Sequence, residues 1–180
     1  MPHTLRTERL LLTPARVRDG GDLARAINDW AVLRETGTWA YPSDADATRR
    51  RLRFAERYDP GEDIVFVVRH GGQVAGTAGL HRQTGDTFEI GYMLGQAYWG
   101  QGLATEAARA VCAFGFAALR ARAITACAYV GNPGSGRVLE KVGFRALPGT
   151  RPGWSAARGA SAPMRDYRLV REGWEPRRGR

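Results

Sequence analysis

The sequence predicts a single α/β (α+β) domain built on a mixed, mostly antiparallel sheet flanked by helices. Three observations support this fold class. The chain has 180 residues, which fits one domain of roughly 100–200 residues. Hydrophobic residues make up 43% and charged residues 25%, as in globular proteins. Strand patterns cluster in the middle of the chain and then alternate with helical patterns, which is typical of mixed domains.

The N-terminal part is expected to hold one strand and one helix. The apolar run from Arg9 to Thr13 predicts a short strand, and Pro14 ends it because proline cannot donate to a ladder. A helix should follow, capped by Asp19 or Asp22. Its apolar residues recur at helical spacing: Leu23, Ala26, Ile27 and Trp30.

A second polar helix is expected before the central strands begin. Ser43 or Asp44 can cap it, and the helix should run to about Tyr58. Its surface is strongly basic, so few apolar residues are available to anchor it. Leu52 and Phe54 are expected to be those anchors.

Three strand patterns then follow with short turns between them. Ile64–Arg69 ends at the turn formed by Gly71 and Gly72, and Val74–Leu80 comes next. A turn at 84–86 leads into Phe88–Leu94. Connections this short join strands that run in opposite directions, so we expect an antiparallel meander.

The second half of the chain alternates between helices and strands. Leu103–Leu119 has the strongest helical pattern, with an apolar face wide enough to lie against a sheet. Ala123–Val130 then predicts a buried strand. Asn132 opens another helix, and Gly143 supplies the residue that ends it.

The C-terminal part is expected to be less regular. Phe144 begins a further strand, and 148–163 has several prolines and glycines without periodicity, which predicts a loop. Met164–Val170 is the last strand pattern. We expect one domain over 1–174 and a basic C-terminal tail at 175–180.

The composition excludes several classes of protein. No apolar run approaches the ~18–20 residues of a membrane span, and the polar N-terminus lacks a secretory signal. A cytoplasmic protein that does not bind a membrane is therefore expected. Cys112 and Cys127 have neither metal-ligand spacing nor the numbers of a disulfide framework, so no metal is expected.

The net charge of +9 is concentrated in the last third of the chain. Residues 1–60 carry 11 positive and 9 negative side chains, 61–120 carry 4 and 5, and 121–180 carry 12 and 4. Basic regions attract phosphates of nucleic acid or of a phosphorylated cofactor, and many are simply solvated surface. The arginines are not interleaved with stacking aromatics, so nucleic-acid binding is not expected.

One glycine-rich segment carries a chemical signal. Trp99-Gly100-Gln101-Gly102 lies just after the strand that ends at Leu94 and opens the strongest helix. Glycines let the backbone approach an anion, and the first-turn amides and dipole of a helix favour negative charge. The segment predicts a pyrophosphate cradle, although a tight turn would need the same glycines. It is neither a Walker loop nor a dinucleotide fingerprint.

Three motifs follow one another along the chain. They are Glu89-Ile90-Gly91-Tyr92-Met93-Leu94, Tyr98-Trp99-Gly100-Gln101-Gly102-Leu103-Ala104-Thr105-Glu106-Ala107, and Asn132-Pro133-Gly134-Ser135 followed by Leu139-Glu140-Lys141-Val142-Gly143-Phe144. In this order they resemble the GNAT superfamily of N-acetyltransferases, and more narrowly its RimJ/RimL type, whose named members acetylate protein N-termini. The segments Thr7–Leu12 and Asp166–Leu169 also resemble that branch, so the likeness spans nearly the whole chain. Trp99 departs from the Gln/Arg that begins the wider superfamily's loop motif.

The resemblance implies an acetyl-CoA site in a splayed sheet. The strand ending in Met93 and Leu94 would pair with the pantetheine arm, which Asn132 would also bind. Backbone amides would hold the pyrophosphate, namely those of Gln101, Gly102, Leu103, Ala104 and Thr105. Arg137 and Lys141, one helical turn apart, could reach the outer phosphate or be ordinary exposed cations.

Glu89 is the candidate general base for acetyl transfer to an amine. It is the only carboxylate inside the apolar strand pattern 88–94, on the face opposite Phe88, Ile90 and Tyr92. The resemblance implies the same role, usually through a water molecule. The alternative is that Glu89 only pairs with a neighbouring arginine.

Ser135 is the candidate donor to the departing thiolate. The resemblance places a serine near the sulfur atom, although a serine at the start of a helix is also an ordinary cap. A backbone amide, that of Met93, would meet the oxyanion. Tyr92 and Tyr129 are alternative hydroxyls, but each occupies a strand position where an aromatic side chain is usually core.

The predicted function is acetyl-CoA-dependent acetylation of a primary amine by direct attack in a ternary complex. The acceptor would be a protein N-terminus or a small-molecule amine, and the protein a monomer or homodimer. Trp39, Tyr41 and Trp154 would border the acceptor cleft or serve as packing. The alternative is a non-catalytic acyl-CoA-binding or regulatory protein on the same fold.

Overall fold

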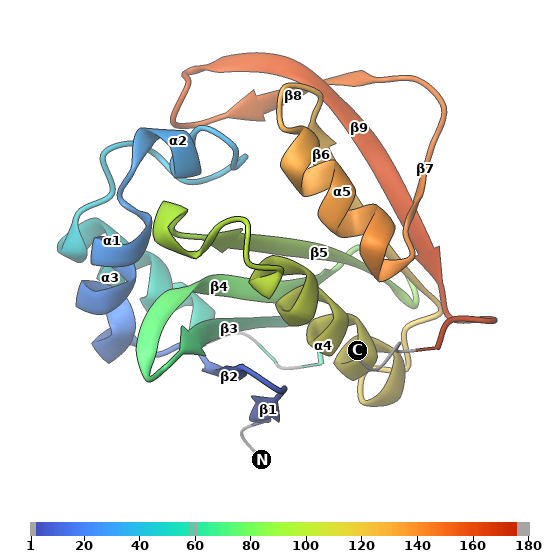
Figure 1. Cartoon of the computed structure of the whole chain (residues 1–180), viewed down its shortest axis with the longest axis horizontal. Coiled ribbons are helices and arrows are strands. Elements are labelled where there is room, and N and C mark those ends of the chain that lie inside the picture. Colours follow the sequence, from blue (N-terminus) through green and yellow to red (C-terminus); the bar gives the residue numbers. More distant parts are fainter. Residues whose placement is uncertain (1–2, 58, 60, 176–180) are drawn as a thin grey trace.

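The computed structural model describes residues 3–57, 59 and 61–175, and over this part of the chain nine strands form one open sheet (Figure 1). The strands follow the order β1-β2-β3-β4-β5-β6-β9-β7, and β8 pairs with β9. Among these strands only β5 and β6 pair in parallel. The strands are β1 (Leu5–Arg6), β2 (Leu10–Pro14), β3 (Asp63–His70), β4 (Gln73–Arg82), β5 (Thr87–Leu94), β6 (Ala123–Tyr129), β7 (Arg145–Ala146), β8 (Arg151–Ser155) and β9 (Ala160–Val170).

The helices cover the two faces of the sheet. They are α1 (Gly20–Ile27), α2 (Trp30–Leu33), α3 (Ala45–Ala55), α4 (Leu103–Ala117) and α5 (Pro133–Val142), with short 3-10 turns η1 (Val17–Asp19) and η2 (Gln96–Tyr98). Helices α4 and α5 share the larger buried cluster with β2–β6 and β9. Helices α1, α2 and α3 contribute to a smaller cluster on the other face, with Val67, Val74 and Met93.

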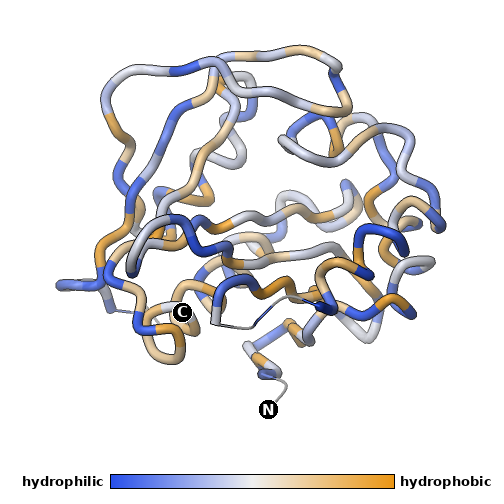
Figure 2. Tube along the Cα trace, turned by 180° about the vertical axis from the view of Figure 1, so that it is seen from behind, coloured by the Kyte–Doolittle hydropathy of each residue, from blue (hydrophilic) through white to orange (hydrophobic). Residues whose placement is uncertain are grey.

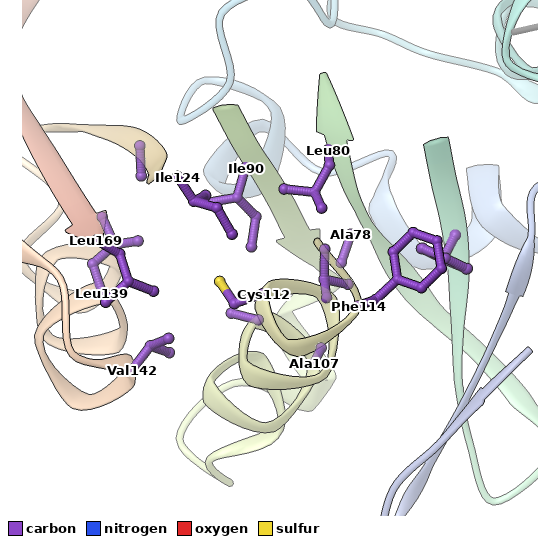
Figure 3. Packing of buried hydrophobic residues seen from close by; sticks show 14 of the residues in the cluster. Ala78, Leu80, Ile90, Ala107, Cys112, Phe114, Ile124, Leu139, Val142 and Leu169 are labelled. Carbon is purple, nitrogen blue, oxygen red and sulfur yellow. The ribbon is translucent and has the colours of Figure 1, made fainter. Parts of the chain in front are cut away.

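Alternation along the strands divides the core between these two faces. Figure 3 shows Leu80, Ile90 and Ile124 directed from three adjacent strands toward Cys112 and its neighbours on α4. Helix α4 approaches the sheet closely at Gly115, where an added Cβ would lie 2.7 Å from a methyl group of Leu80. No helix in the described ranges has both the length and the apolar character that crossing a membrane requires.

The central elements confirm the expectations from the sequence. The antiparallel meander, the long helix at 103 and the helix capped by Asn132 all form within one or two residues of their predicted bounds. The second N-terminal helix begins where expected, because the Asp44 carboxylate accepts a hydrogen bond of 2.7 Å from the amide of Ala47. These elements have a clear local period and a local start or stop signal, which explains the agreement.

The first helix is shorter than its apolar spacing predicts. Helix α1 ends at Ile27, and Trp30 instead begins the separate helix α2. The Asp29 carboxylate accepts a hydrogen bond of 2.6 Å from the amide of Ala31, so it caps a new helix rather than continuing the first. Trp30 is consequently 43% exposed and is not a core residue.

The expectation for the end of the second helix is also wrong. Helix α3 stops at Ala55, and Tyr58 itself lies outside the described residues. Leu52 anchors the helix as expected, but Phe54 is 64% exposed. The buried side chain that accompanies Leu52 is Thr48, one helical turn earlier, so the inward stripe does not include position 54.

The predicted loop at 148–163 is instead mostly a β-hairpin. Strand β8 pairs antiparallel with β9, which begins at Ala160 rather than Met164. Pro152 and Pro163 are paired with each other across the hairpin, so the two positions that lack a backbone N–H occupy a single residue pair of the ladder. This hairpin arches above the sheet beside α2 (Figure 1), and its tube has few strongly hydrophobic positions (Figure 2). Of the expected tail at 175–180, residues 176–180 lie outside the described part.

The sheet opens between β5 and β6. The two strands pair over only three residue pairs, from Thr87 with Ala123 to Glu89 with Thr125. Beyond Glu89 the strands separate, and β6 continues its ladder with β9 alone. The C-terminal half of β5 therefore has an edge that no strand of the described chain covers. This opening confirms the splayed sheet implied by the resemblance.

Substituting Gly95 with alanine should destabilise the fold more than the same change at Gly91. An added Cβ at Gly95 would lie 2.1 Å from the carbonyl oxygen of Ala26, whereas nothing lies within 4 Å at Gly91. Because this overpacking involves backbone atoms, we expect Gly95→Ala to cost about 1–3 kcal/mol of unfolding free energy. Urea denaturation of both variants measures the difference, and equal midpoints would contradict the close approach of α1 to β5.

Candidate active site

A cavity of about 490 Å³ lies at the opening between β5 and β6. Four segments line it: the end of β5, the turn that leads into α4, the start of α5, and α2 with the residues that follow it. The lining includes 31–32, 34–36, 92–94, 102–105 and 131–135. Segments far apart in sequence therefore meet where the two strands separate.

The N-terminus of α4 forms one wall of the cavity. Gly102 is the N-cap residue, has φ 77°, and makes no side-chain cap hydrogen bond. Gly100 has φ 74°, so two residues of this turn need the left-handed conformation that glycine allows. The first-turn residues Leu103, Ala104 and Thr105 line the cavity, and amides at this end of a helix lack partners within it. The wall suits an anion, because the helix dipole adds positive charge there.

Gln101 differs from the other residues of the predicted cradle because it does not line the cavity. Its side-chain amide donates to the carbonyl of Ala97 at 2.9 Å, and its own carbonyl accepts from the Arg9 guanidinium at 2.9 Å. Gln101 therefore shapes the turn with both its polar groups. The sequence did not indicate this contact with Arg9.

The open edge of β5 presents the backbone groups of alternate residues. The amide of Gly95 donates to Ala75 on β4 at 2.8 Å, and in an antiparallel ladder this direction repeats every second residue. The Met93 amide therefore points toward β4, which corrects the expectation that it meets an oxyanion. The groups of Tyr92 and Leu94 face the opening, and the Leu94 carbonyl accepts from the Trp99 indole at 2.7 Å.

Asn132, Ser135 and Tyr92 meet at the start of α5. Asn132 caps this helix, since its side-chain oxygen accepts from the Ser135 amide at 3.1 Å. The hydroxyls of Tyr92 and Ser135 are 2.9 Å apart, and the Tyr92 hydroxyl also donates to the Ser135 carbonyl at 3.1 Å. Burial raises the pKa of Tyr92 well above its usual value, so this hydroxyl stays protonated. Tyr92 is therefore part of the cavity wall as well as of the core.

Glu89 lies on the other face of β5. Its neighbours 88 and 90 point into the α4 cluster, so the Glu89 side chain points away from Ser135 and does not line the cavity. The Cys127 thiol lies 3.6 Å from the Glu89 carboxylate. Burial, followed by the charge of Glu89, raises the pKa of Cys127 to about 12. Within the described ranges Glu89 makes no ion pair of 4 Å or less with an arginine, but its charge contributes to the raised pKa of Arg151, so the pairing alternative stays open.

A second carboxylate, Glu35, lines the cavity and was missed from the sequence. One oxygen accepts from Arg158 at 2.9 Å and lies 2.9 Å from the Nε atom of Arg34, while the other oxygen is buried without a partner among the described residues. Arg158 also donates to the Arg34 carbonyl at 2.7 Å. These bonds join the residues after α2 to the β8–β9 hairpin. Because the partners are more than 120 residues apart, no local pattern could have indicated them.

Arg137 and Lys141 line the cavity as expected, and neither forms an ion pair within the part of the chain that is described. The three aromatic residues expected to border an acceptor cleft do not line this cavity, so that role stays a prediction. Trp39 packs on the smaller core cluster beneath Arg51, at 4.5 Å, while Tyr41 and Trp154 are about half exposed. Tyr129 uses its hydroxyl to donate to the Trp154 carbonyl at 2.6 Å, so it ties the hairpin to β6.

Taken together, the geometry suits a phosphorylated ligand with an extended arm. The helix terminus and two cations can hold phosphates, the open edge of β5 can pair with an amide-bearing chain, and the Tyr92–Ser135 hydroxyls lie beside that edge. The described residues contain no group of three or more His, Cys, Asp or Glu side chains arranged to hold a metal ion.

The family model that matches this chain and a curated relative are both described as acetyltransferases. The family model described as an acetyltransferase (GNAT) domain matches residues 9–145. An uncharacterized N-acetyltransferase of Bacillus subtilis, YoaA, is 30% identical over 145 residues, covering 78% of this chain and 82% of that protein.

Solved structures share the fold at lower identity. RimJ of Mycobacterium smegmatis, determined with a CoA disulfide, has a TM-score of 0.81 at 22% identity, covering 95% of this chain and 88% of that one. RimL, described as a ribosomal L7/L12 α-N-protein acetyltransferase in complex with coenzyme A, has a TM-score of 0.82 at 17% identity. The match covers 93% of this chain and 98% of RimL.

The proximity of Glu89 and Cys127 can be tested by thiol chemistry. Glu89→Gln removes the charge that raises the pKa of Cys127, so more thiolate should form at pH 9. Each unit of lowered pKa gives about a tenfold larger thiolate fraction. We expect faster alkylation of Cys127 by iodoacetamide, followed by peptide mass spectrometry. Cys112, which is fully buried, serves as the internal silent thiol.

Asp46→Asn, on the exposed surface of α3, is the matched control for that experiment. It also removes one carboxylate charge, but far from β6 in the sequence and on another layer of the fold. Unchanged alkylation of Cys127 in Glu89→Gln, or equal acceleration in both variants, would show that the Glu89 carboxylate does not act on the thiol.

Proposed function

Because the chain belongs to the GNAT family of acetyltransferases, we propose that it transfers an acetyl group from acetyl-CoA to a primary amine by direct attack in a ternary complex. The opening between β5 and β6, which leads to the uncapped N-terminus of α4, carries this proposal. It offers one continuous surface for both the arm and the phosphates of the donor.

Acetyl-CoA fits the polar groups of this surface in order. The amides from Gly102 to Thr105 would hold the pyrophosphate, with Gln101 shaping the turn. Arg137 and Lys141 would reach the outer phosphate. The pantetheine arm would pair with β5 along 92–94, and the Asn132 side chain, whose oxygen caps α5, still has its N–H groups for the arm.

Ser135 and Tyr92 would act on the leaving group. A thiolate that departs beside the start of α5 needs a hydrogen-bond donor, and the Ser135 hydroxyl lies at this place in the cavity. Tyr92, held protonated by burial, would turn its proton from the Ser135 carbonyl to the Ser135 hydroxyl oxygen across their 2.9 Å contact, which leaves the Ser135 proton free to point at the sulfur. The pair therefore offers a donor without a second charged group.

Glu89 would receive the proton that the amine releases. Its side chain lies on the face of β5 opposite Ser135, so the amine and the thioester approach the strand from opposite faces. Because Glu89 does not line the cavity, we propose that the proton reaches it through a water molecule. The attacking amine must be neutral, which a nearby carboxylate base maintains during the reaction.

The proposed acceptor is the α-amine of a protein N-terminus. RimL is described as acting on such an amine. Arg34 and Arg158 share the single carboxylate of Glu35, which leaves one positive charge in excess beside the cavity and disfavours polycationic small amines. Small-molecule amines are the alternative. Paired assays with N-terminal peptides and with a polyamine at equal concentration distinguish the two acceptor classes.

Binding of the donor should appear as thermal stabilisation. Ligand at 100 times its dissociation constant adds about 2.7 kcal/mol, which shifts the unfolding midpoint of a domain this size by roughly 5–10 °C. We expect that shift from acetyl-CoA and a smaller one from ADP, measured by differential scanning fluorimetry. No shift at millimolar acetyl-CoA would refute the donor site.

Glu89→Gln and Ser135→Ala should lower turnover without abolishing donor binding. Loss of a general base costs about 10²–10⁴ in kcat, so Glu89→Gln should fall in that range. Release of free thiol from acetyl-CoA, followed with a disulfide reagent, measures turnover. Full donor binding together with unaltered turnover in both variants would remove these two residues from the mechanism.

A further inference from the structure

Arg9, immediately before β2, contacts the turn that precedes α4. Its Nη1 atom donates to the Gln101 carbonyl at 2.9 Å. Its Nε and Nη2 atoms each lie 2.7 Å from Oε2 of Glu106, in the first turn of α4. Both partners are more than 90 residues away in sequence. The contact therefore links the N-terminal segment to the wall of the cavity.

Glu106 is held from several sides at once. Its Oε1 accepts from the Thr7 hydroxyl at 2.6 Å and from the Arg9 amide at 2.8 Å. Its side chain is 16% exposed. Burial alone would raise the pKa of Glu106, but the hydrogen bonds from Thr7 and Arg9 and the Arg9 charge lower it below its usual value. Glu106 is therefore ionised at neutral pH and keeps Arg9 in place.

The hydrogen bond from Arg9 to the Gln101 carbonyl also sets the direction of the Gly102 N–H. In a trans peptide the C=O and the following N–H point in opposite directions. Because the Gln101 carbonyl points at Arg9, the Gly102 N–H points away from Arg9. Gly102 lines the cavity, whereas Arg9 and Gln101 do not. The N–H of Gly102 is thus directed to the side where the anion would lie.

The turn would not hold this orientation by itself. Gly100 and Gly102 flank Gln101, and both have positive φ. A Cβ added at either glycine would meet no atom of a non-adjacent residue closer than 3.5 Å. Glycines with this freedom let the intervening peptide rotate at little steric cost. The Gln101 side chain holds on to the Ala97 carbonyl, whereas the Arg9 bond is made to the 101–102 peptide group itself and therefore selects its orientation.

We propose that Arg9 and Glu106 are positioning residues of the donor site: Arg9 fixes the 101–102 peptide so that the Gly102 N–H faces the pyrophosphate, and Glu106 fixes Arg9. The inference rests on the proposed acetyl-CoA site. It assigns a role in binding to residues that do not touch the donor. The planar guanidinium is needed, because it serves a carboxylate and a carbonyl at once, whereas a lysine ammonium lacks that fork.

The experiment compares two donors that differ in the pyrophosphate. Acetyl-CoA contains it, and S-acetylpantetheine does not. Arg9→Lys and Glu106→Gln should raise the KM for acetyl-CoA about tenfold, as expected for loss of a hydrogen bond to a charged group. The kcat at saturating acetyl-CoA and the KM for S-acetylpantetheine should stay within about twofold of the wild type, because neither depends on the pyrophosphate contact.

Arg25→Ala is the matched control, since Arg25 also pairs with a carboxylate but on the exposed surface of α1. It should leave both KM values unchanged. Thermal unfolding of each variant checks that it folds. Dissociation constants for CoA and pantetheine, from calorimetry, give the same comparison without turnover.

The outcomes separate this inference from the proposed function. A wild-type protein that binds neither donor refutes the acetyl-CoA site itself. A wild-type protein that binds CoA, with Arg9→Lys and Glu106→Gln binding it equally well, overturns the positioning role. Equal weakening for CoA and pantetheine also overturns it, because that pattern means a general loss of structure.

Discussion

The separation of β5 from β6 is the constraint on which the rest of the molecule depends. Beyond Glu89, the backbone groups of Tyr92 and Leu94 face an opening instead of a neighbouring strand. Unpaired backbone groups at a sheet edge need a partner, which water or an extended ligand can supply. The opening persists because β6 is held by β9 over seven residue pairs, and Ile124 and Leu169 are buried in the same core. The same packing that stabilises the fold thus keeps a binding edge open.

Strand alternation then separates the two halves of the proposed reaction. Tyr92 points to α5 and meets Ser135, while Glu89 points to the other face and meets Cys127. A donor lying along the open edge and an acceptor arriving from the opposite face would reach the same strand without competing for space. The hairpin of β8 and β9, joined to the residues after α2 by Arg158 and Glu35, borders that second approach. Few strongly hydrophobic residues lie in this arch, and the polar bonds of Arg158 and Tyr129 help to hold it in place.

Local signals explain what the sequence could predict. The meander, α4 and the start of α5 follow from periodicity, turns and caps, and the glycine-rich turn before α4 was identified with them. The roles of the other cavity residues on those elements came from the resemblance to the GNAT superfamily. Contacts between distant segments had no such signal. Glu35 with Arg158, and Arg9 with Glu106, each join residues about 100 positions apart, and the chemistry of either residue alone indicates nothing. The prediction that Phe54 anchors α3 was wrong for a related reason, because apolar character does not say which side of a short polar helix faces inward.

The positively charged side chains in the last third of the chain differ in whether a carboxylate lies beside them. Arg151 lies 2.9 Å from Asp166, and Arg158 lies 2.9 Å from Glu35, so these two cations are neutralised where they stand. Arg137 and Lys141 line the cavity and make no ion pair within the described ranges. A cation without a counter-charge, close to a helix N-terminus, leaves a positive field that a phosphate can enter without displacing a carboxylate. The net charge alone did not distinguish surface arginines from such a site, but the distribution of their partners favours phosphate binding at the cavity.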